Sequence, residues 1–169
     1  CRVIPALKGY FFLDFILNYR YNTYMKRVTV NISKLNKEAV LPEYTREGDS
    51  GFDLRSVENT RILPGRMAVV STGLALDLPS GYEVQIRPRS GLSIKGITVN
   101  NSPGTIDSNY RGELKIILIN HGMEIFNISI GDRIAQGVLQ EVPKAVWNLV
   151  DTLTDSNRGE DGFGSSGVK

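Results

Sequence analysis

Short apolar stretches with a two-residue period, separated by Pro and Gly turns, recur along most of this chain. Residues 28–32 and 72–82 alternate between apolar and polar side chains, and residues 114–120 form an apolar run of strand length. A period of two is typical of strands that bury one face. Turn signals such as Leu63-Pro64-Gly65 separate these runs, and almost no helical periodicity is present. The pattern predicts an all-β sandwich or barrel.

Composition narrows the class of protein. A chain of 169 residues with 41% hydrophobic and 22% charged residues predicts one globular domain. The net charge of +2 favours neither a nucleic-acid partner nor an anionic membrane surface. The only cysteine, Cys1, excludes an intramolecular disulfide, and the only histidine, His121, excludes a His-rich zinc site. We expect a reducing compartment, namely the cytoplasm, or a nucleus or organelle in a eukaryotic cell.

Residues 1–24 differ from the rest because Phe and Tyr crowd together there. Their apolar run, residues 9–17, is broken by Asp14 and is too short to cross a bilayer. We expect Met25 to be the ordinary start and residues 1–24 to be upstream or expression-derived sequence; the alternative is a targeting or partner-binding arm. Residues 25–148 are then the β domain, and residues 149–169 a flexible C-terminal arm.

One turn offers three chemically useful side chains within residues 104–113. Asp107 is a candidate base, Tyr110 has a ring that can stack on a sugar or base, and Arg111 can bind an anion. Both flanking runs read as strands, so the turn between them is held stiffly. The alternative is an ordinary hairpin whose polar residues only make turn hydrogen bonds.

Two further stretches carry oxygen and phosphate chemistry. Asp53 follows the Gly51 turn, where a carboxylate can hold a hydrated magnesium ion, although an exposed turn Asp is the plainer interpretation. Arg89 and Ser90 follow Pro88, which ends a strand, and such a pair can grip a phosphate unless the Arg merely sits in a loop. Residues 90–95 could form one short helix. No P-loop sequence is present.

The last two stretches are a tight turn and a glycine-rich tail. A strand follows Gly131, with Gln136 pointing opposite to its neighbour, and Asp132 and Arg133 could pair within the turn. In the tail, Arg158 and Phe163 lie among glycines, so this segment is either a frayed end or a flap that closes over a ligand.

Read together, these stretches resemble, in order and spacing, the five motifs of the trimeric dUTPase family. The matching residues are 49–54, 87–93, 104–113, 131–138 and 158–167. The resemblance implies a distorted jelly-roll-like β-barrel or sandwich with one short helix. It also implies a homotrimer whose three active sites lie between subunits, with the C-terminal arm reaching over a neighbour's site.

By the same resemblance, the chain hydrolyses dUTP to dUMP and pyrophosphate, which keeps uracil out of DNA and supplies dUMP for dTMP synthesis. Magnesium (Mg2+) would sit on the triphosphate, and Asp107 would activate the water that attacks the α-phosphorus. Tyr110 would pack on the deoxyribose and leave no room for a 2′-hydroxyl.

The resemblance further implies a set of binding residues. Asn101 would read the polar edge of uracil, while Asp53 and Gln136 would hold waters of the metal rather than the metal itself. Three positions depart from the commonest family wording: Asn109 replaces a frequent Asp, Gly137 a larger apolar residue, and Ser166 a frequent Thr. Substrate contacts are implied for Arg89, Ser90, Gly91, Asn101, Gly104, Thr105, Ile106, Tyr110, Lys115, Gln136, Arg158, Phe163, Gly164, Ser165 and Ser166.

Two other functions compete with hydrolysis of dUTP. The related deoxycytidine triphosphate deaminases share the fold, but they need a different acid and base arrangement for attack on the cytosine ring. A nucleotide-responsive binding protein is the second alternative, in which the dUTP site is a switch and the aromatic residues 1–24 contact a protein partner.

Overall fold

Alternating apolar and polar side chains build this molecule from antiparallel strands. The computed structural model describes residues 26–162. Its only helix in this range is one turn, α2 (Ser90–Ser93), within the stretch where a short helix was predicted. The strands are β1 (Asn31–Lys34), β2 (Phe52–Arg55), β3 (Thr60–Ile62), β4 (Met67–Asp77), β5 (Tyr82–Arg87), β6 (Ile97–Val99), β7 (Gly104–Asp107), β8 (Glu113–Asn120), β9 (Phe126–Ile128) and β10 (Arg133–Glu141).

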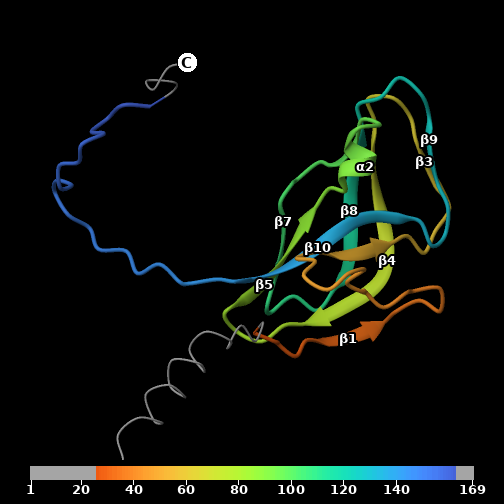
Figure 1. Ribbon diagram of the computed structural model, residues 1–169, viewed down its shortest axis with the longest axis horizontal. Helices are drawn as coiled ribbons and strands as arrows, with labels where there is room; N and C mark the ends of the chain where they lie inside the picture. Colours follow the sequence, from red (N-terminus) through yellow and green to blue (C-terminus); the bar gives the residue numbers. More distant parts are fainter. Residues whose placement is uncertain (1–25, 163–169) are drawn as a thin grey trace, which may run out of the picture.

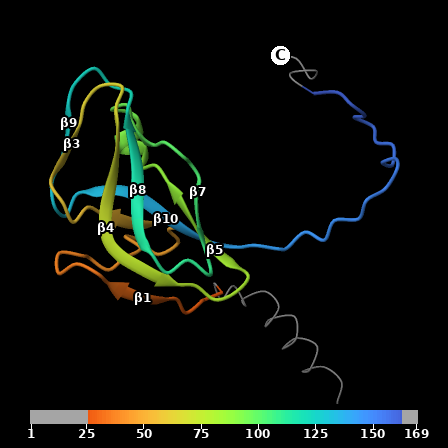
Figure 2. The ribbon, with the colours of Figure 1, turned by 180° about the vertical axis from the view of Figure 1, so that it is seen from behind.

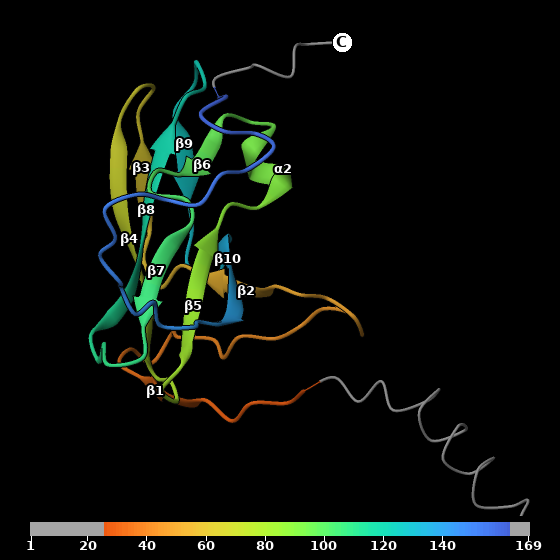
Figure 3. The same ribbon diagram turned by 90° about the vertical axis from the view of Figure 1, so that its left-hand side faces the viewer.

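The strands form two four-stranded sheets and one two-stranded ribbon. The first sheet has the order β1-β4-β8-β6, the second β2-β10-β5-β7, and the ribbon pairs β3 with β9. Figure 1 shows β4 and β8 in one layer, and the side view in Figure 3 shows β5 and β10 in the layer packed against it. The predicted all-β, jelly-roll-like class is confirmed. The first strand begins at Asn31 rather than near Val28, and all four of its residues are exposed, as at a sheet edge.

The core lies between the inner faces of the two sheets. Because β8 alternates strictly, its even-numbered residues from Leu114 to Leu118 are buried while Lys115 points outward. On β5, Val84 and Ile86 face inward, which leaves the odd-numbered side chains on the outer surface. The strand period thus creates both the core and a continuous polar face on the second sheet. Further core residues are Phe52, Leu54, Val70, Leu74, Leu76, Val99, Ile134 and Ala135.

Buried polar groups fix the ends of the strands. Asn120 at the end of β8 donates to the carbonyls of Ile62 and Glu124, both at 2.8 Å, and its side-chain oxygen accepts from Gly122. The buried Thr72 hydroxyl donates to the Leu114 carbonyl at 2.6 Å. No buried side-chain nitrogen or oxygen in the described part of the chain lacks a partner.

Residues 142–162 leave the sheets after β10 and run away from them, as Figures 1 and 2 show. The Val142 amide still donates to Gly81 at 2.7 Å, whereas residues 143–162, within the described range, hydrogen-bond only among themselves. Several apolar side chains of this arm are nearly fully exposed, with Trp147 at 91% and Leu149 at 99%. At the root of the arm, Lys26 forms an ion pair with Glu141 at 2.9 Å.

None of the described helices has the length and apolar character required to span a bilayer.

Gly73 lies where the pairing of β4 with β8 is interrupted. It contacts the first residue of β8, which follows the candidate catalytic turn. The register shifts between Ser71 and Ala75, and Gly73 adopts a positive φ of 66°. Its amide donates to a carboxylate oxygen of Glu113 at 2.9 Å, so the bulge anchors the residue at which β8 begins. A Cβ atom at Gly73 would lie 2.8 Å from Asn36 and 3.0 Å from Ala39.

We therefore expect Gly73→Ala to destabilise the fold more than Gly65→Ala. Both glycines have nearly the same positive φ, 66° and 68°, but no atom lies within 4 Å of the Cβ position at Gly65. The backbone alone should cost about 1–2 kcal/mol at each position. Crowding should add about 1–3 kcal/mol at Gly73 only. Urea unfolding of the two variants measures the difference, and equal losses would contradict the role assigned to crowding.

Candidate active site

The outer face of the second sheet gathers polar side chains from three strands. Gln136 on β10 lies opposite Asp53 of β2 on one side and opposite Arg87 of β5 on the other. Directly opposed residues share a face of the sheet, so the three side chains form one row. This pairing brings together the predicted metal-water residues Asp53 and Gln136, which are 83 positions apart in the printed sequence.

The Asp53 carboxylate is held between two guanidinium groups. Its Oδ1 lies 3.0 Å from Arg89 Nε in an ion pair, and its Oδ2 accepts a hydrogen bond from Arg133 Nη1 at 3.1 Å. The suggested turn pairing of Asp132 with Arg133 is wrong: Asp132 accepts the Ser129 amide at 2.8 Å instead. Arg133 is a residue of this cluster that sequence reasoning missed, because only the register of β2 against β10 reveals its partner.

Gln136 is oriented by its amide nitrogen, which donates to the Pro88 carbonyl at 2.8 Å. Its oxygen lies 2.5 Å from the position a Cβ atom would take on Gly51, so any larger residue there would displace it. Arg89, Ser90 and Gly91 follow directly after Pro88, where Arg89 precedes the single turn of α2. The predicted phosphate-binding loop and the predicted metal-water residues are therefore adjacent.

The donors present suit a hydrated magnesium ion. They are a carboxylate and an amide oxygen, the hard ligands that Mg2+ prefers, and the glycine at 51 leaves room beside the amide oxygen. Among residues 26–162 no group of three or more His, Cys, Asp or Glu side chains could enclose a metal directly. Contact through waters, with phosphate oxygens completing the shell, fits this donor set.

Gly137 departs from the family wording for a packing reason. It lies opposite Phe52 in the β2–β10 pairing, and a Cβ atom there would meet the Phe52 ring at 2.3 Å and 2.4 Å. The ring, which is 9% exposed and also packs edge-on against Tyr44, fills this volume. The aromatic side chain on β2 thus replaces the bulk that is missing on β10.

The candidate base lies at the other end of β5. On β7, Asp107 is opposite Glu83, Ile106 opposite Val84, and Gly104 opposite Ile86. Asp107 and Thr105 are exposed, whereas Ile106 is half-buried against the core. Asn101 lies close to Gly104, with its amide nitrogen 3.1 Å from the position a Cβ atom would take there. The predicted uracil reader is therefore beside the strand that carries Asp107.

Tyr110 folds back over Gly112 in the turn after Asp107. Its amide donates to the Asp107 carbonyl and its hydroxyl to the Glu113 carbonyl, each at 3.1 Å, and the side chain is 44% exposed. Arg111, a predicted anion binder, is engaged instead with Asp77 and with the carbonyls of Ser108 and Tyr110. The turn is thus built to hold the aromatic ring, and Arg111 holds the turn.

Within one chain, the predicted site residues fall into two groups that lie apart. Arg87 and Glu83, which mark the two groups, are four residues apart on β5, or roughly 13 Å along the strand. Lys115 lies on the other sheet, 3.5 Å from a Glu113 oxygen. Arg158 lies in the arm and donates to the Asp161 carbonyl at 2.8 Å. Phe163, Gly164, Ser165 and Ser166 lie outside the described residues.

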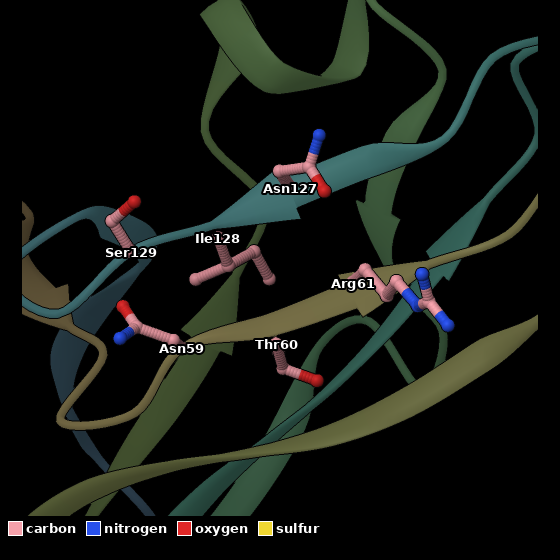
Figure 4. Close-up of a pocket in the computed structure, with 6 residues that line it drawn as sticks. All are labelled: Asn59, Thr60, Arg61, Asn127, Ile128 and Ser129. Carbon is pink, nitrogen blue, oxygen red and sulfur yellow. The ribbon is translucent and has the colours of Figure 1, made fainter.

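Two hollows mark the surface. One, of about 290 Å³, lies beside the Asp53 cluster and is lined by Val40, Leu41, Glu43, Tyr44, Thr45, Asp53, Arg55 and Arg133. The other, of about 500 Å³, lies along the β3–β9 ribbon, where Figure 4 shows Asn59, Thr60, Arg61, Asn127, Ile128 and Ser129. The second hollow contains none of the predicted site residues.

A sequence model of the dUTPase family matches residues 37–167. The chain is 54% identical over 145 residues to the deoxyuridine 5′-triphosphate nucleotidohydrolase of Helicobacter hepaticus, covering 85% of this chain and 92% of that one. It is also 54% identical to the enzyme of that name from Wolinella succinogenes, covering 85% and 97% of the two chains. The chain belongs to the dUTPase family.

Solved structures agree with this assignment. The dUTPase of Staphylococcus bacteriophage 80alpha, solved with dUpNHpp, superposes with a TM-score of 0.78 at 30% identity, covering 83% of this chain and 99% of the phage chain. A dUTPase variant from phage phi11 of S. aureus, described as coordinating a structural Mg(II) ion, superposes with a TM-score of 0.68 at 26% identity, covering 73% and 97%.

In this dUTPase, Gly112→Ala should displace the Tyr110 ring. The added methyl would meet the Tyr110 hydroxyl at 2.3 Å and the adjacent ring carbon at 2.5 Å, while no positive φ restricts residue 112. NMR signals of selectively labelled tyrosine rings would report the movement, and Tyr110→Phe would identify the Tyr110 signal by its loss. Unchanged Tyr110 signals in the alanine variant would contradict the described packing.

Proposed function

We propose that this dUTPase converts dUTP to dUMP and pyrophosphate through attack of a water molecule on the α-phosphorus, with Asp107 as the general base. The observation that carries the proposal is the family match over residues 37–167, which includes Asp107 and the loop that contains Arg89 and Ser90. Asp107 is exposed at the end of β7, where its carboxylate can reach a water on a bound nucleotide.

The phosphate side of the reaction belongs to the other group of residues. Arg89, Ser90 and the Gly91 amide bind phosphate oxygens, and Arg158 with the tail beyond it closes over them. Gln136 and Asp53 would hold waters of an Mg2+ ion bound to the triphosphate. The bound ion would offset the phosphate charge, and the guanidinium groups stabilise the charge that develops on the leaving pyrophosphate.

Base and sugar selection belong to the hairpin around Asp107. Asn101 with the backbone of residues 104–106 reads the polar edge of uracil, and Tyr110 packs on the deoxyribose so that a ribose 2′-hydroxyl has no room. Its ring is preorganised for this role because it rests on Gly112 and its hydroxyl is bonded to Glu113. Lys115 adds a positive charge on β8, the next strand along the chain.

A homotrimer with sites between subunits accounts for the separation of the two groups. One chain leaves Asp107 and Gln136 at opposite ends of β5, and a neighbouring copy supplying one of them would bring the two groups into one site. The outer face of the first sheet also carries a stripe of apolar side chains that a second copy would cover. Met67 and Val69, 59% and 58% exposed, lie opposite Ile119 and Ile117 there. The exposed arm with Trp147 would reach a neighbour's site.

In the cell, this reaction would keep uracil out of DNA and supply dUMP for dTMP synthesis. The substrate and both products, dUMP and pyrophosphate, are small free molecules, so the activity requires neither nucleic acid nor a membrane. We place it in the cytoplasm, in keeping with a chain whose only cysteine is Cys1.

Replacement of the base tests the mechanism. Asp107→Asn should lower kcat for dUTP by about 10²–10⁴-fold, which is the usual contribution of general base catalysis. Binding of dUpNHpp should be retained, because the amide has nearly the same shape. Pyrophosphate release and calorimetric titration measure the two effects, with the turn carboxylate variant Asp132→Asn as the matched control. Normal turnover by Asp107→Asn would refute the assignment.

Mixing two inactive variants tests the composite site. Asp107→Asn and Arg89→Ala each damage a different group. In a mixed trimer, an Asp107→Asn chain still supplies Arg89 and an Arg89→Ala chain still supplies Asp107, so some interfaces should have both residues intact. We expect pyrophosphate release to rise at least severalfold above either variant alone after co-refolding. If the mixture stays as inactive as its components while mass spectrometry confirms mixed trimers, one chain must supply both groups to the same site.

A further inference from the structure

Arg133 holds Arg89 in two separate ways. Its backbone carbonyl accepts a hydrogen bond from Arg89 Nη1 at 3.2 Å. Its guanidinium binds one carboxylate oxygen of Asp53, Oδ2, while Arg89 Nε lies 3.0 Å from the other, Oδ1. The side chain of residue 133 therefore reaches Arg89 only through Asp53. Removing that side chain would leave the direct backbone contact in place.

The three charged groups are unequally exposed to water. The Asp53 side chain is 18% exposed, that of Arg89 26%, and that of Arg133 42%. A carboxylate that has lost most of its hydration needs charged partners, and here each oxygen has one. Two guanidinium groups against one carboxylate also leave the cluster with a net positive charge, which suits the approach of a triphosphate.

Arg133 and Arg89 approach Asp53 from different parts of the surface. Arg133 lines the 290 Å³ hollow together with Asp53, whereas Arg89 precedes α2 in the predicted phosphate-binding loop. Arg89 uses Nε and Nη1 for its contacts with Asp53 and Arg133, and its Nη2 has no hydrogen-bond partner among residues 26–162. The two N–H groups of Nη2 are therefore available to a phosphate.

We propose that Arg133 is a positioning residue for the phosphate site and acts through Asp53. By binding Oδ2, Arg133 keeps the Asp53 carboxylate paired and fixes its orientation while Arg89 interacts with a bound phosphate. Without it, Asp53 would recruit more of the Arg89 guanidinium, and Arg89 would be withdrawn from the phosphate. The proposal rests on the proposed hydrolysis of dUTP, since it assigns Arg89 to the phosphates of that substrate.

Two measurements on the full chain test this role. In ligand-free protein, Arg133→Ala should shift the Arg89 Nε–H signal in a ¹⁵N correlation spectrum, and Arg133→Lys should restore it in part. In the pyrophosphate assay, Arg133→Ala should lower kcat/KM for dUTP by about 10- to 100-fold, mainly through KM, as is usual for residues that orient a ligand-binding group. Arg61→Ala, an exposed arginine of β3 far from the cluster, is the matched control.

A double-mutant cycle separates positioning from a general structural effect. If Arg133 acts through Asp53, adding Arg133→Ala to Asp53→Asn should change kcat/KM by less than about twofold, because the interaction is already lost. Fully additive losses, or an unchanged Arg89 signal in Arg133→Ala, would overturn the inference. Failure of wild-type protein to release pyrophosphate from dUTP would instead refute the proposed function, and the ligand-free spectra would still decide the role of Arg133.

Discussion

The position of β10 between β2 and β5 is the constraint on which the rest of the site depends. Its pairing with β2 places Gln136 opposite Asp53, and its pairing with β5 places the same residue opposite Arg87. The register of this pairing shifts between Arg133 and Ala135, and the Arg133 guanidinium binds Asp53. A shift of the register by one residue would send Gln136 into the core and Ile134 to the surface, so burial of the apolar face also specifies the polar site.

Three glycines near the site each leave room for a different neighbouring side chain. Gly51 leaves room for the Gln136 amide, Gly112 for the Tyr110 ring, and Gly137 for the Phe52 ring. In the first two cases the reserved space orients a proposed substrate or metal-water residue. In the third it completes the core directly behind the site. The departure at Gly137 thus has a structural explanation within this chain, since Phe52 supplies the missing volume.

The two groups at opposite ends of β5 explain why a small domain would act as an oligomer. Strand geometry holds them four residues apart along β5, roughly 13 Å, in one chain. Apolar side chains remain on the outer face of β4 and along residues 146–153, so the monomer has surfaces that further copies could cover. The composite sites that we propose between copies would account for both features.

The sequence alone determined the all-β class, the approximate strands and turns, and the chemical types of Asp53, Arg89, Asp107 and Gln136, because strand periodicity and turn residues are local properties. It did not determine where β1 begins, where Arg133 points or what compensates for Gly137. Those depend on which strands pair and in what register, and pairing is decided by burial over the whole chain. The nearest carboxylate to Arg133 in sequence is Asp132, but its ion-pair partner is Asp53 on the neighbouring strand β2. Only the tertiary structure reveals contacts of that kind.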